Sequence, residues 1–303
     1  MSAVVRHAPG SATEAAAIIR DAATATRVLR LVGAGSWLDA GHPVRAAAEL
    51  STAALSGITA YRPEDLTLSA GAGTTLAELD AATRAHGQWC PLLPWGDDRG
   101  TIGATIATAT TGPFAERLGR PRNLVLGIEC VDGTGRIVAA GGRVVKNVAG
   151  FDLTRAVTGS WGTLGLITHV HLRLRARPVI DESWAVEVDV GSLPAIEAFA
   201  GGPFAPLACV NVAADGTFPR ARDDRTWIVR LGGNDANVVA ARAALRSIGT
   251  IRPVAAPTWD DLRVTHAPAA RALQWRWDAL SLRLRERFDP AHVLNRGLLG
   301  EGA

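Results

Sequence analysis

The order of apolar and polar residues near the start of the chain predicts a helix followed closely by a strand. Ser11 and Glu14 have the spacing of a capping box, and the residues after them predict a helix over 15–25. Apolar residues then alternate over 28–32, which is typical of a strand. This strand runs directly into the small-residue loop 33–37, GAGSW. Such a loop lets the backbone turn tightly and lets its amides approach a ligand closely.

Strands and helices continue to alternate at short intervals. Strands are predicted over 58–62 and 66–70, and a capped helix is predicted over 75–87. A β-hairpin is predicted over 124–139, because an Asp-Gly pair supplies the backbone freedom that its turn needs. This mixture favours an α+β fold.

A longer strand is predicted over 166–175, with one apolar face and one polar face. The apolar face carries Val170, Leu172 and Leu174, and the polar face carries His169, His171, Arg173 and Arg175. Two histidines on one face can share a metal ion. The arginines that continue this face oppose a cation, so a solvated polar face is the favoured interpretation.

Beyond Pro178 the pattern changes to a compact strand–helix–strand–strand–helix unit. Its strands are predicted in WAVEVDV, LACVNV and TWIVRL, and its second helix follows Asn234 and stops at Gly249. The first helix is predicted near 193–200, and a final helix of the chain over 269–288.

These boundaries predict three parts of the chain. A main domain is expected over 1–178 and a small α+β cap over 179–256. A C-terminal segment over 257–303 is expected to return to the main domain.

Composition narrows the class of protein. Of the 303 residues 48% are apolar and 20% are charged, which suffices for a sizeable core. The net charge is +3 and the basic residues are scattered, so nucleic acid is not an expected partner. No apolar run has the length that crosses a bilayer and no secretory pattern begins the chain, so a cytoplasmic protein is expected. Cys90, Cys130 and Cys209 are isolated, which predicts reduced, partly buried thiols and no iron–sulfur cluster.

Two stretches of small residues are candidates for ligand contact. The loop GAGSWLDAG has Leu38 where a dinucleotide fingerprint needs its third glycine, so a standard Rossmann site is excluded. Its amides over 34–37 can still converge on a pyrophosphate, although an ordinary turn is the alternative. The residues 98–105 suit the floor of a flat ligand and equally a tight Ala/Gly interface.

A third stretch, GGRVVKNVAGFDLTRAVTGSWGTLG, covers 141–165 and contains Lys146, the only lysine of the chain. A compact ammonium group fits some sites where a planar guanidinium does not. A role that arginine cannot fill is therefore one interpretation of Lys146, and an arginine-rich composition is the other.

With these three stretches and the closing FDPAHVLNRG, the chain resembles FAD-binding domains of the vanillyl-alcohol-oxidase and p-cresol-methylhydroxylase (PCMH) type. Within that family it is similar to FAD-binding subunits of glycolate oxidase, as in ITAYRPEDLTL, AELDAATRAHGQWCPL and KNVAGFDLTRAVTGSWGTLGLIT. The resemblance covers 27–178 and resumes near 270. It implies an α+β fold made of a two-subdomain FAD-binding domain of the PCMH type with a small α+β cap.

The resemblance also implies where FAD is held. The first loop matches the pyrophosphate loop, and the second stretch matches a strand-loop against pyrophosphate and flavin. The third matches the adenosine half, and the closing motif lies near the flavin ring. The implied residues are Gly33, Ala34, Gly35, Ser36 and Trp37; Gly100, Thr101, Gly103 and Ala104; Lys146, Gly162, Gly165 and Ile167; and Asn295.

Two departures from the family bear on chemistry. Members that bind FAD covalently carry a linking His or Cys, whereas this loop has Ser36 and Trp37, which implies non-covalent FAD. Related catalytic subunits carry a His-Ala-Gly-Asp-Gly-Asn-like metal motif in a larger cap, and no such motif stands between Pro178 and Ala256. No convincing catalytic base is found: Tyr61 is the only tyrosine, and no histidine stands between His171 and His266.

The function implied is oxidation of a small 2-hydroxy acid to a 2-oxo acid by hydride transfer to the flavin. Because base and metal motif are missing, the chain is expected to be one subunit of a complex with a larger flavin subunit and an iron–sulfur subunit. Exposed tryptophan and arginine on the cap are expected at that interface. The chain is therefore expected in the cytoplasm, attached to the inner membrane through its partners. The alternatives are a self-sufficient small flavin dehydrogenase of a hydroxy acid or sugar, and a structural subunit whose FAD site has decayed.

Overall fold

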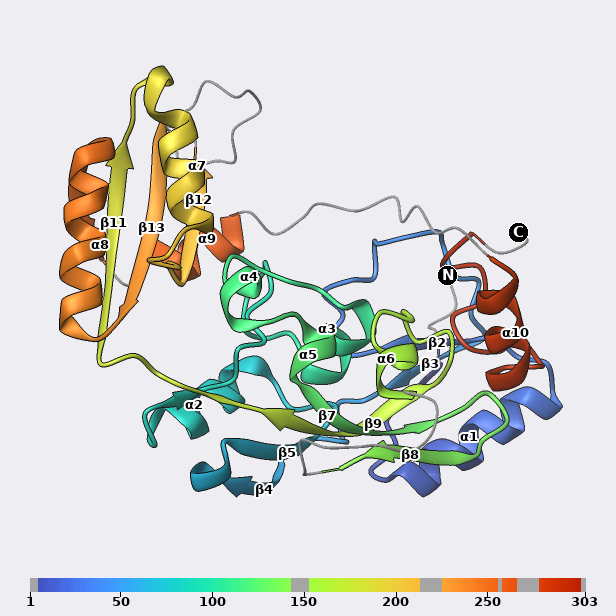
Figure 1. Cartoon of the computed structure of the whole chain (residues 1–303). Coiled ribbons are helices and arrows are strands. Elements are labelled where there is room, and N and C mark those ends of the chain that lie inside the picture. Colours follow the sequence, from blue (N-terminus) through green and yellow to red (C-terminus); the bar gives the residue numbers. More distant parts are fainter. Residues whose placement is uncertain (1–4, 143–152, 213–224, 256–257, 266–277, 301–303) are drawn as a thin grey trace.

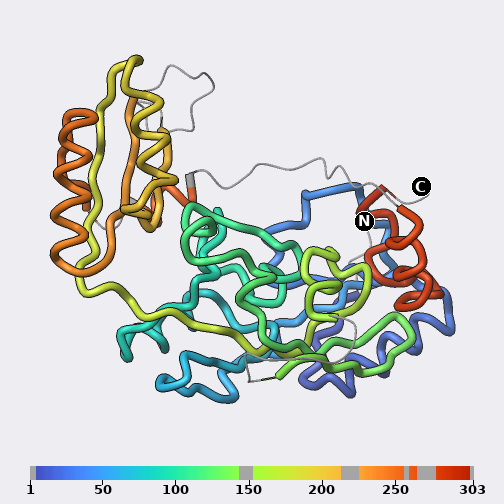
Figure 2. Tube along the Cα trace, in the orientation of Figure 1, coloured from blue at the N-terminus to red at the C-terminus, as the bar shows by residue number. Residues whose placement is uncertain are grey.

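The structure is a computed structural model that describes residues 5–142, 153–212, 225–255, 258–265 and 278–300. Figure 1 shows a large main lobe with a smaller cap at one end, and the helices α1 and α10 at the other. The tube in Figure 2 follows the chain from the main lobe into the cap and back. We call the described part of 180–254 the cap and the described residues 5–178 and 278–300 the main lobe. The division into domains remains a prediction.

The main lobe begins with a small parallel sheet. Its strand order is β1-β3-β2, and both outer strands run parallel to β3. Helix α1 packs on this sheet through Ala15, Ile19 and Ala22, all buried. The elements are β1 (Val5–His7), α1 (Ala12–Thr24), β2 (Leu29–Val32) and β3 (Ala48–Ser51). The predicted helix and strand are confirmed, and the Ser11 hydroxyl caps α1 by accepting from the Glu14 amide at 3.2 Å.

A five-stranded antiparallel sheet in the order β4-β5-β9-β7-β8 forms the rest of the main lobe. Helices α3, α5 and α6 cover one face of it (Figure 1). Its strands are β4 (Ile58–Arg62), β5 (Thr67–Gly71), β7 (Val125–Val131), β8 (Ile137–Gly141) and β9 (Leu166–Arg173). The helices and short elements are η1 (Pro63–Asp65), α2 (Leu76–Arg84), β6 (Gln88–Trp89), α3 (Ile102–Thr108), α4 (Ala115–Leu118), α5 (Pro121–Leu124), α6 (Leu153–Val157) and β10 (Arg175–Ala176).

The alternation predicted for the long strand is confirmed. Val170, Leu172 and Leu174 are fully buried, while His169 and His171 lie on the other face. A ring nitrogen of His169 lies 2.7 Å from the Thr59 hydroxyl, and one of His171 lies 2.7 Å from the Ser69 hydroxyl. Among the residues that the structure describes, no group of His, Cys, Asp and Glu is arranged to hold a metal ion.

The second small-residue stretch is not the strand-loop that the resemblance implied. Residues 102–108 form helix α3, and Thr101 caps it by accepting from the Ala104 amide. Gly103 lets α3 approach Ala72, the residue after β5, closely: a Cβ at Gly103 would lie 2.7 Å from the Ala72 Cβ. The tight Ala/Gly interface that is the alternative interpretation of 98–105 is therefore present at Gly103 and Ala72.

The cap has the order β11 (Ile180–Glu187), η2 (Val190–Ser192), α7 (Leu193–Gly201), β12 (Ala208–Val212), β13 (Thr226–Gly233), α8 (Asp235–Ile248) and β14 (Thr250–Val254). Its sheet runs β12-β13-β11-β14, all antiparallel, which is the ferredoxin-like arrangement. Sequence analysis missed β14. The strand contains Pro253, which a strand tolerates at a sheet edge, and β14 is an edge strand that pairs only with β11.

The two faces of the cap sheet have different neighbours. One face packs on α7 and α8, and the other packs on the main lobe through Trp89, Phe114 and Trp259. The expectation of exposed tryptophans on the cap is wrong. Trp184 and Trp227 are half-buried against the helix-side core, because alternate residues of β11 and β13 point to that face.

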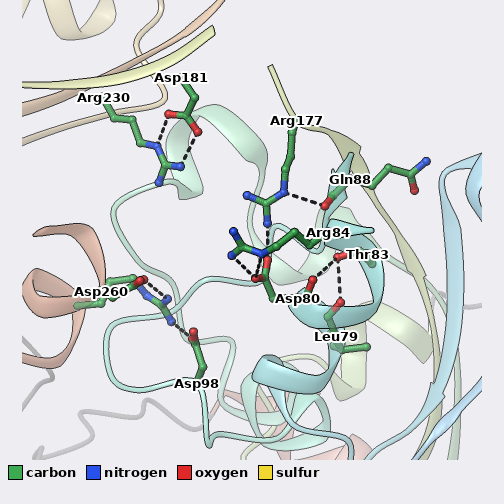
Figure 3. A network of polar contacts seen from close by, with 11 residues as sticks. Leu79, Asp80, Thr83, Arg84, Gln88, Asp98, Arg177, Asp181, Arg230 and Asp260 are labelled. Carbon is green, nitrogen blue, oxygen red and sulfur yellow. Dashed lines mark hydrogen bonds and ion pairs between the residues drawn. The ribbon is translucent and has the colours of Figure 1, made fainter. Parts of the chain in front are cut away.

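Two arginines lie over Trp89 where the cap meets the main lobe. Arg230 of β13 pairs with Asp181 of the cap at 2.7 and 2.6 Å (Figure 3). Arg230 also lies over the main-lobe rings of Trp89 and Phe114, 5.4 and 5.2 Å from their centroids. Arg177 also lies over Trp89 and binds Asp80 and the Gln88 carbonyl. We call Trp89, Phe114, Arg177 and Arg230 the junction cluster.

The described C-terminal part of the chain packs against the main lobe. Helix α9 (Thr258–Thr265) was not predicted; its Arg263 is buried and donates to the Pro94 carbonyl and to Asp98. Helix α10 (Ala279–Phe288) has Asp278 as its N-cap residue. The predicted start of this helix, 269–277, lies outside the described residues.

The three cysteines are free thiols, as predicted. Cys90 and Cys130 are buried and Cys209 is half-buried. Burial raises the pKa of each thiol to about 12. The thiols are therefore protonated near neutral pH and are poor nucleophiles and metal ligands.

Candidate functional site

A pocket lies where the parallel strands β2 and β3 end. The loop after β2 forms one wall, helix α3 a second, and the turn at Trp161 with the C-terminal segment a third. The pocket spans about 750 Å³, a volume that includes space open to solvent. Ligands of α/β sheets often bind at the carboxyl ends of parallel strands, as here.

Most residues that sequence analysis assigned to a cofactor line this pocket. They come from four separate parts of the chain: Gly33, Gly35, Ser36 and Trp37; Gly103 and Ala104; Gly162, Gly165 and Ile167; and Asn295. Ala34, Gly100 and Thr101 adjoin these residues in sequence but do not line the pocket. Lys146 lies outside the described residues.

Small side chains make the close approach of these walls possible. A Cβ at Gly33 would lie 2.6 Å from the Thr101 hydroxyl and 3.0 Å from the Ala104 Cβ. Gly162 has φ +72°, and a Cβ there would lie 2.9 Å from the Asn295 amide nitrogen. Larger residues at either position would move the walls, so glycine sets the width of the pocket.

One buried hydroxyl in the pocket has capacity left for a ligand. Thr52 follows β3 and lines the pocket, its exposed fraction is 6%, and its Oγ1 has no hydrogen-bond partner in the described structure. An unsatisfied buried hydroxyl costs free energy unless a ligand or water completes it. Sequence analysis missed Thr52, because nothing in the letters STAALSG indicates which residue faces the end of β2.

The charge of the pocket favours an anion. Arg30 is the one charged residue among the described residues that line it, and its guanidinium donates to the Leu38 carbonyl at the rim. Apolar residues supply much of the remaining wall: Leu31, Val32, Leu38, Val44, Ala107, Leu166 and Leu298. The pocket thus combines apolar walls with one cation and several backbone amides, a combination suited to a ligand with flat rings and a negative group.

Two tryptophans meet at the pocket. The rings of Trp37 and Trp161 lie edge to face with centroids 5.9 Å apart. Trp161 adopts φ +55°, which is uncommon for a bulky residue. Its carbonyl accepts a hydrogen bond from the side-chain Nδ2 of Asn295 at 2.8 Å. Sequence analysis did not indicate that these two indoles are neighbours, because they stand far apart along the chain.

Comparison with known proteins identifies the first half of the chain. Residues 3–141 match a family model described as an FAD binding domain. The N-terminal part of the chain is an FAD-binding domain. Solved structures agree on the fold: alkyldihydroxyacetonephosphate synthase aligns with a TM-score of 0.68 at 16% identity, over 86% of this chain and 56% of that one. The implied α+β fold of PCMH type is confirmed.

Several proteins of known name are similar in sequence to this chain. The glycolate oxidase subunit GlcE of Escherichia coli is 32% identical over 79% of this chain and 65% of its own length. The D-lactate dehydrogenase of Archaeoglobus fulgidus is 35% identical over 55% of this chain and 37% of its own length. The D-2-hydroxyglutarate dehydrogenase of Xanthomonas citri pv. viticola is 33% identical over 56% and 36%. The chain spans less than two thirds of the length of each.

The structural features of the pocket are compatible with FAD. The free hydroxyl of Thr52, the absence of acidic residues among the described lining residues and the close backbone at Gly33 all suit a pyrophosphate between two ring systems. When bound, FAD supplies the redox chemistry, and the residues of this chain bind and orient it. In the described part of the chain, no helix is long and apolar enough to cross a membrane.

The described lining residues of the pocket include no side chain that can serve as a base near neutral pH. Tyr61, the only tyrosine, donates its hydroxyl to Gln88 at 3.0 Å and does not line the pocket. Burial raises the pKa of Tyr61, which opposes its use as a base.

Proposed function

We propose that the pocket holds FAD non-covalently and that the chain is the FAD-binding subunit of a complex that oxidises a small 2-hydroxy acid to the 2-oxo acid. Support comes from the FAD-binding domain and from the relatives, whose names are those of glycolate oxidase subunits, lactate dehydrogenases and a hydroxyglutarate dehydrogenase. The bond broken would be the carbinol C–H, with hydride passing to the flavin. The general reaction in this proposal, FAD-dependent oxidation of a hydroxy acid, is supported by the relatives as a group.

The observation that carries the subunit role is the chemistry of the pocket wall. Oxidation of an alcohol needs a positioned base and an anchor for the substrate carboxylate beside the cofactor. Among the described lining residues, Arg30 is the one charged group, and no base accompanies it. A second chain that supplies the base is therefore the simplest arrangement, and the relatives GlcE and GlcD bear the names of glycolate oxidase subunits.

Titration with FAD tests the cofactor part of the proposal. The purified chain should bind one FAD, and acid precipitation should release the yellow colour into the supernatant, because the first loop offers Ser36 and Trp37 in place of a linking histidine. Flavin that stays with the pellet would contradict non-covalent binding. A colourless chain that takes up no FAD would support the alternative of a decayed site.

Steady-state turnover tests the subunit part. The isolated FAD-loaded chain should reduce a dye with glycolate or lactate only weakly, and the complex purified with its native partners should do so strongly. We propose a larger flavin subunit and an iron–sulfur subunit as these partners, with attachment to the inner membrane through them. Strong turnover by the chain alone would establish the self-sufficient dehydrogenase instead.

The cofactor contacts proposed for FAD are the pocket residues together with Ala34, Gly100, Thr101 and Lys146. Lys146 is tested by Lys146→Arg, which keeps the charge and changes the shape of the cation. A weaker FAD affinity or a lower partner-supported turnover is expected. Unchanged values for both would make the single lysine an accident of composition.

A further inference from the structure

The C-terminal segment forms part of the sheet that ends at the pocket. The Leu29 amide donates to the Val293 carbonyl at 2.7 Å, and the Asn295 amide donates to the Leu29 carbonyl at 3.0 Å. Val293 and Leu294 are fully buried in the core beneath α1. The segment therefore lies beside β2 as a short parallel extension of the N-terminal sheet.

The side chain of Asn295 joins this extension to two other parts of the main lobe. Its Oδ1 accepts from the Leu31 amide at 2.8 Å, and its Nδ2 donates to the Trp161 carbonyl at 2.8 Å. The side chain is buried, with an exposed fraction of 5%. Asn295 itself has φ +46°, a conformation that asparagine adopts more readily than most residues. Both polar atoms of the carboxamide thus have protein partners although the residue lines the pocket.

The second of these bonds reaches a strained part of the backbone. Trp161 and Gly162 both have positive φ, at +55° and +72°. The conformation at Trp161 costs free energy and persists only where the surroundings hold it. The Trp161 backbone amide donates to the Ala107 carbonyl of α3 at 2.8 Å. On the other side, the side-chain Nδ2 of Asn295 donates to the Trp161 carbonyl. This pair of bonds fixes the indole that meets Trp37 at the pocket.

We propose that Asn295 is a positioning residue: its carboxamide braces the strained Trp161 turn against β2 and so couples the docking of the C-terminal segment to the shape of the FAD pocket. The inference rests on the proposed binding of FAD in this pocket. It differs from the direct flavin contact that the sequence implied for Asn295, because the brace acts through Trp161. Coupling of this kind is reciprocal, so bound FAD also stabilises the docked segment.

Two variants separate the brace from general stability. Asn295→Asp keeps the size, the tolerance of a positive φ and the acceptor for Leu31, but loses the donor to the Trp161 carbonyl. Val293→Ala weakens the same segment in the core without touching Trp161 or lining the pocket. Amide hydrogen exchange at Trp161 and Thr163 reports the turn without FAD, since both amides are hydrogen-bonded to protein carbonyls.

Asn295→Asp should raise exchange at Trp161 and Thr163 by about fivefold or more, and should raise the Kd for FAD by about tenfold, the effect of losing one buried hydrogen bond. Val293→Ala should leave the exchange rates and the Kd for FAD within about threefold of wild type, even if it lowers Tm as much as Asn295→Asp does. The defect of Asn295→Asp in FAD binding should shrink as pH falls from about 8 to about 5, because burial at this position raises the pKa of a carboxyl group and protonation returns a donor to it.

Unchanged exchange at Trp161 in Asn295→Asp, or the same rise in Val293→Ala, would overturn the brace. A Kd that rises with no recovery at low pH would also overturn it, in favour of a direct contact between the amide and FAD. If the wild-type chain binds no FAD, the proposed function fails, while the exchange measurement still decides whether Asn295 holds the turn.

Discussion

The pocket proposed for FAD and the junction cluster both contain tryptophan, yet Arg230 at the junction and Thr52 in the pocket are used in opposite ways. At the junction, Arg230 is engaged twice, by the Asp181 carboxylate and by two aromatic rings. In the pocket, the Thr52 hydroxyl has no partner, and the walls are glycine, alanine and apolar side chains. The Arg230 guanidinium is thus paired within the chain, whereas the Thr52 hydroxyl, at the wall of an open pocket, is left for a ligand. Substitutions should therefore separate the two regions: the junction governs stability, and the pocket governs cofactor affinity.

The largest expected effect comes from removing the ring at the centre of the junction. Trp89 is 2% exposed and contacts Phe114, Arg177 and Arg230. Trp89→Ala should lower the free energy of unfolding by about 3–5 kcal/mol, measured by urea denaturation. The Kd for FAD of the folded variant should stay within about threefold of wild type.

Trp89→Phe is the matched control, because it keeps a ring under both guanidinium groups and removes an indole N–H that has no partner. It should lose clearly less stability than Trp89→Ala. A large loss of FAD affinity in the folded Trp89→Ala protein would contradict the separation of the two regions.

Filling the pocket should produce the converse result. Ala107 lies on α3 and lines the pocket, so Ala107→Phe would place a ring in the space proposed for FAD. The Kd for FAD, measured by flavin fluorescence, should rise about a hundredfold, whereas the free energy of unfolding without FAD should fall by less than about 2 kcal/mol. Ala240→Phe, on the exposed side of α8, is the control and should change neither quantity.

A smaller and sharper effect is expected from Thr52→Val, which removes the free hydroxyl and keeps the shape of the side chain. The Kd for FAD should rise about three- to tenfold, the effect of losing one hydrogen bond to the cofactor. The chain without FAD should be as stable as wild type or more so, because an unsatisfied buried group has gone.

Thr83→Val is the control for Thr52→Val. Thr83 is fully buried as well, but its hydroxyl donates to the Leu79 carbonyl on α2 (Figure 3). Its loss should lower stability and leave FAD affinity unchanged. Equal behaviour of the two threonines would remove the case for Thr52 as a ligand contact.

The smallest effect concerns α2, which carries Asp80 at the junction and begins beside the loop that leads into α3. Hydrogen bonds from the Thr75 amide and hydroxyl lower the pKa of Glu78 below its ordinary value of 4.5. A lowered folded-state pKa contributes stability above the unfolded value, and that stability is lost as pH falls through the folded one. Wild type should lose less than about 1 kcal/mol of stability through Glu78 below about pH 4.5.

Glu78→Gln retains a capping side chain and should lack this acid-dependent loss, so Tm of the variant and of wild type should converge as pH falls. FAD affinity at neutral pH should be the same in both. A shift of FAD affinity in Glu78→Gln would show that α2 transmits the state of one region to the other.

The sequence predicted the features that depend on local pattern. The capped helices at Ser11 and Thr75 and the alternating strand 166–173 were found because capping and side-chain period are local properties. The pocket residues that were found came from a resemblance between ordered motifs. Thr52 and the Trp37–Trp161 contact were missed, because they depend on how separate strands and turns come together. Helix α3 was missed as well, since its small residues carry no helical period of apolar side chains.

The hydrogen bond between Leu31 and Asn295 spans 264 residues of sequence. At about 5–20 residues per second, a ribosome needs tens of seconds to synthesise that interval after β2 has emerged. During this time the nascent chain can form its first sheet and the cap, but the third wall of the pocket still lacks Asn295 and Leu298. The site proposed for FAD is therefore complete only after synthesis of the C-terminal segment, and loading with the cofactor would be a late event in the life of the chain. A ribosome-bound chain stalled before residue 295 would present the loop 33–37 and the Trp161 turn without the segment that joins them.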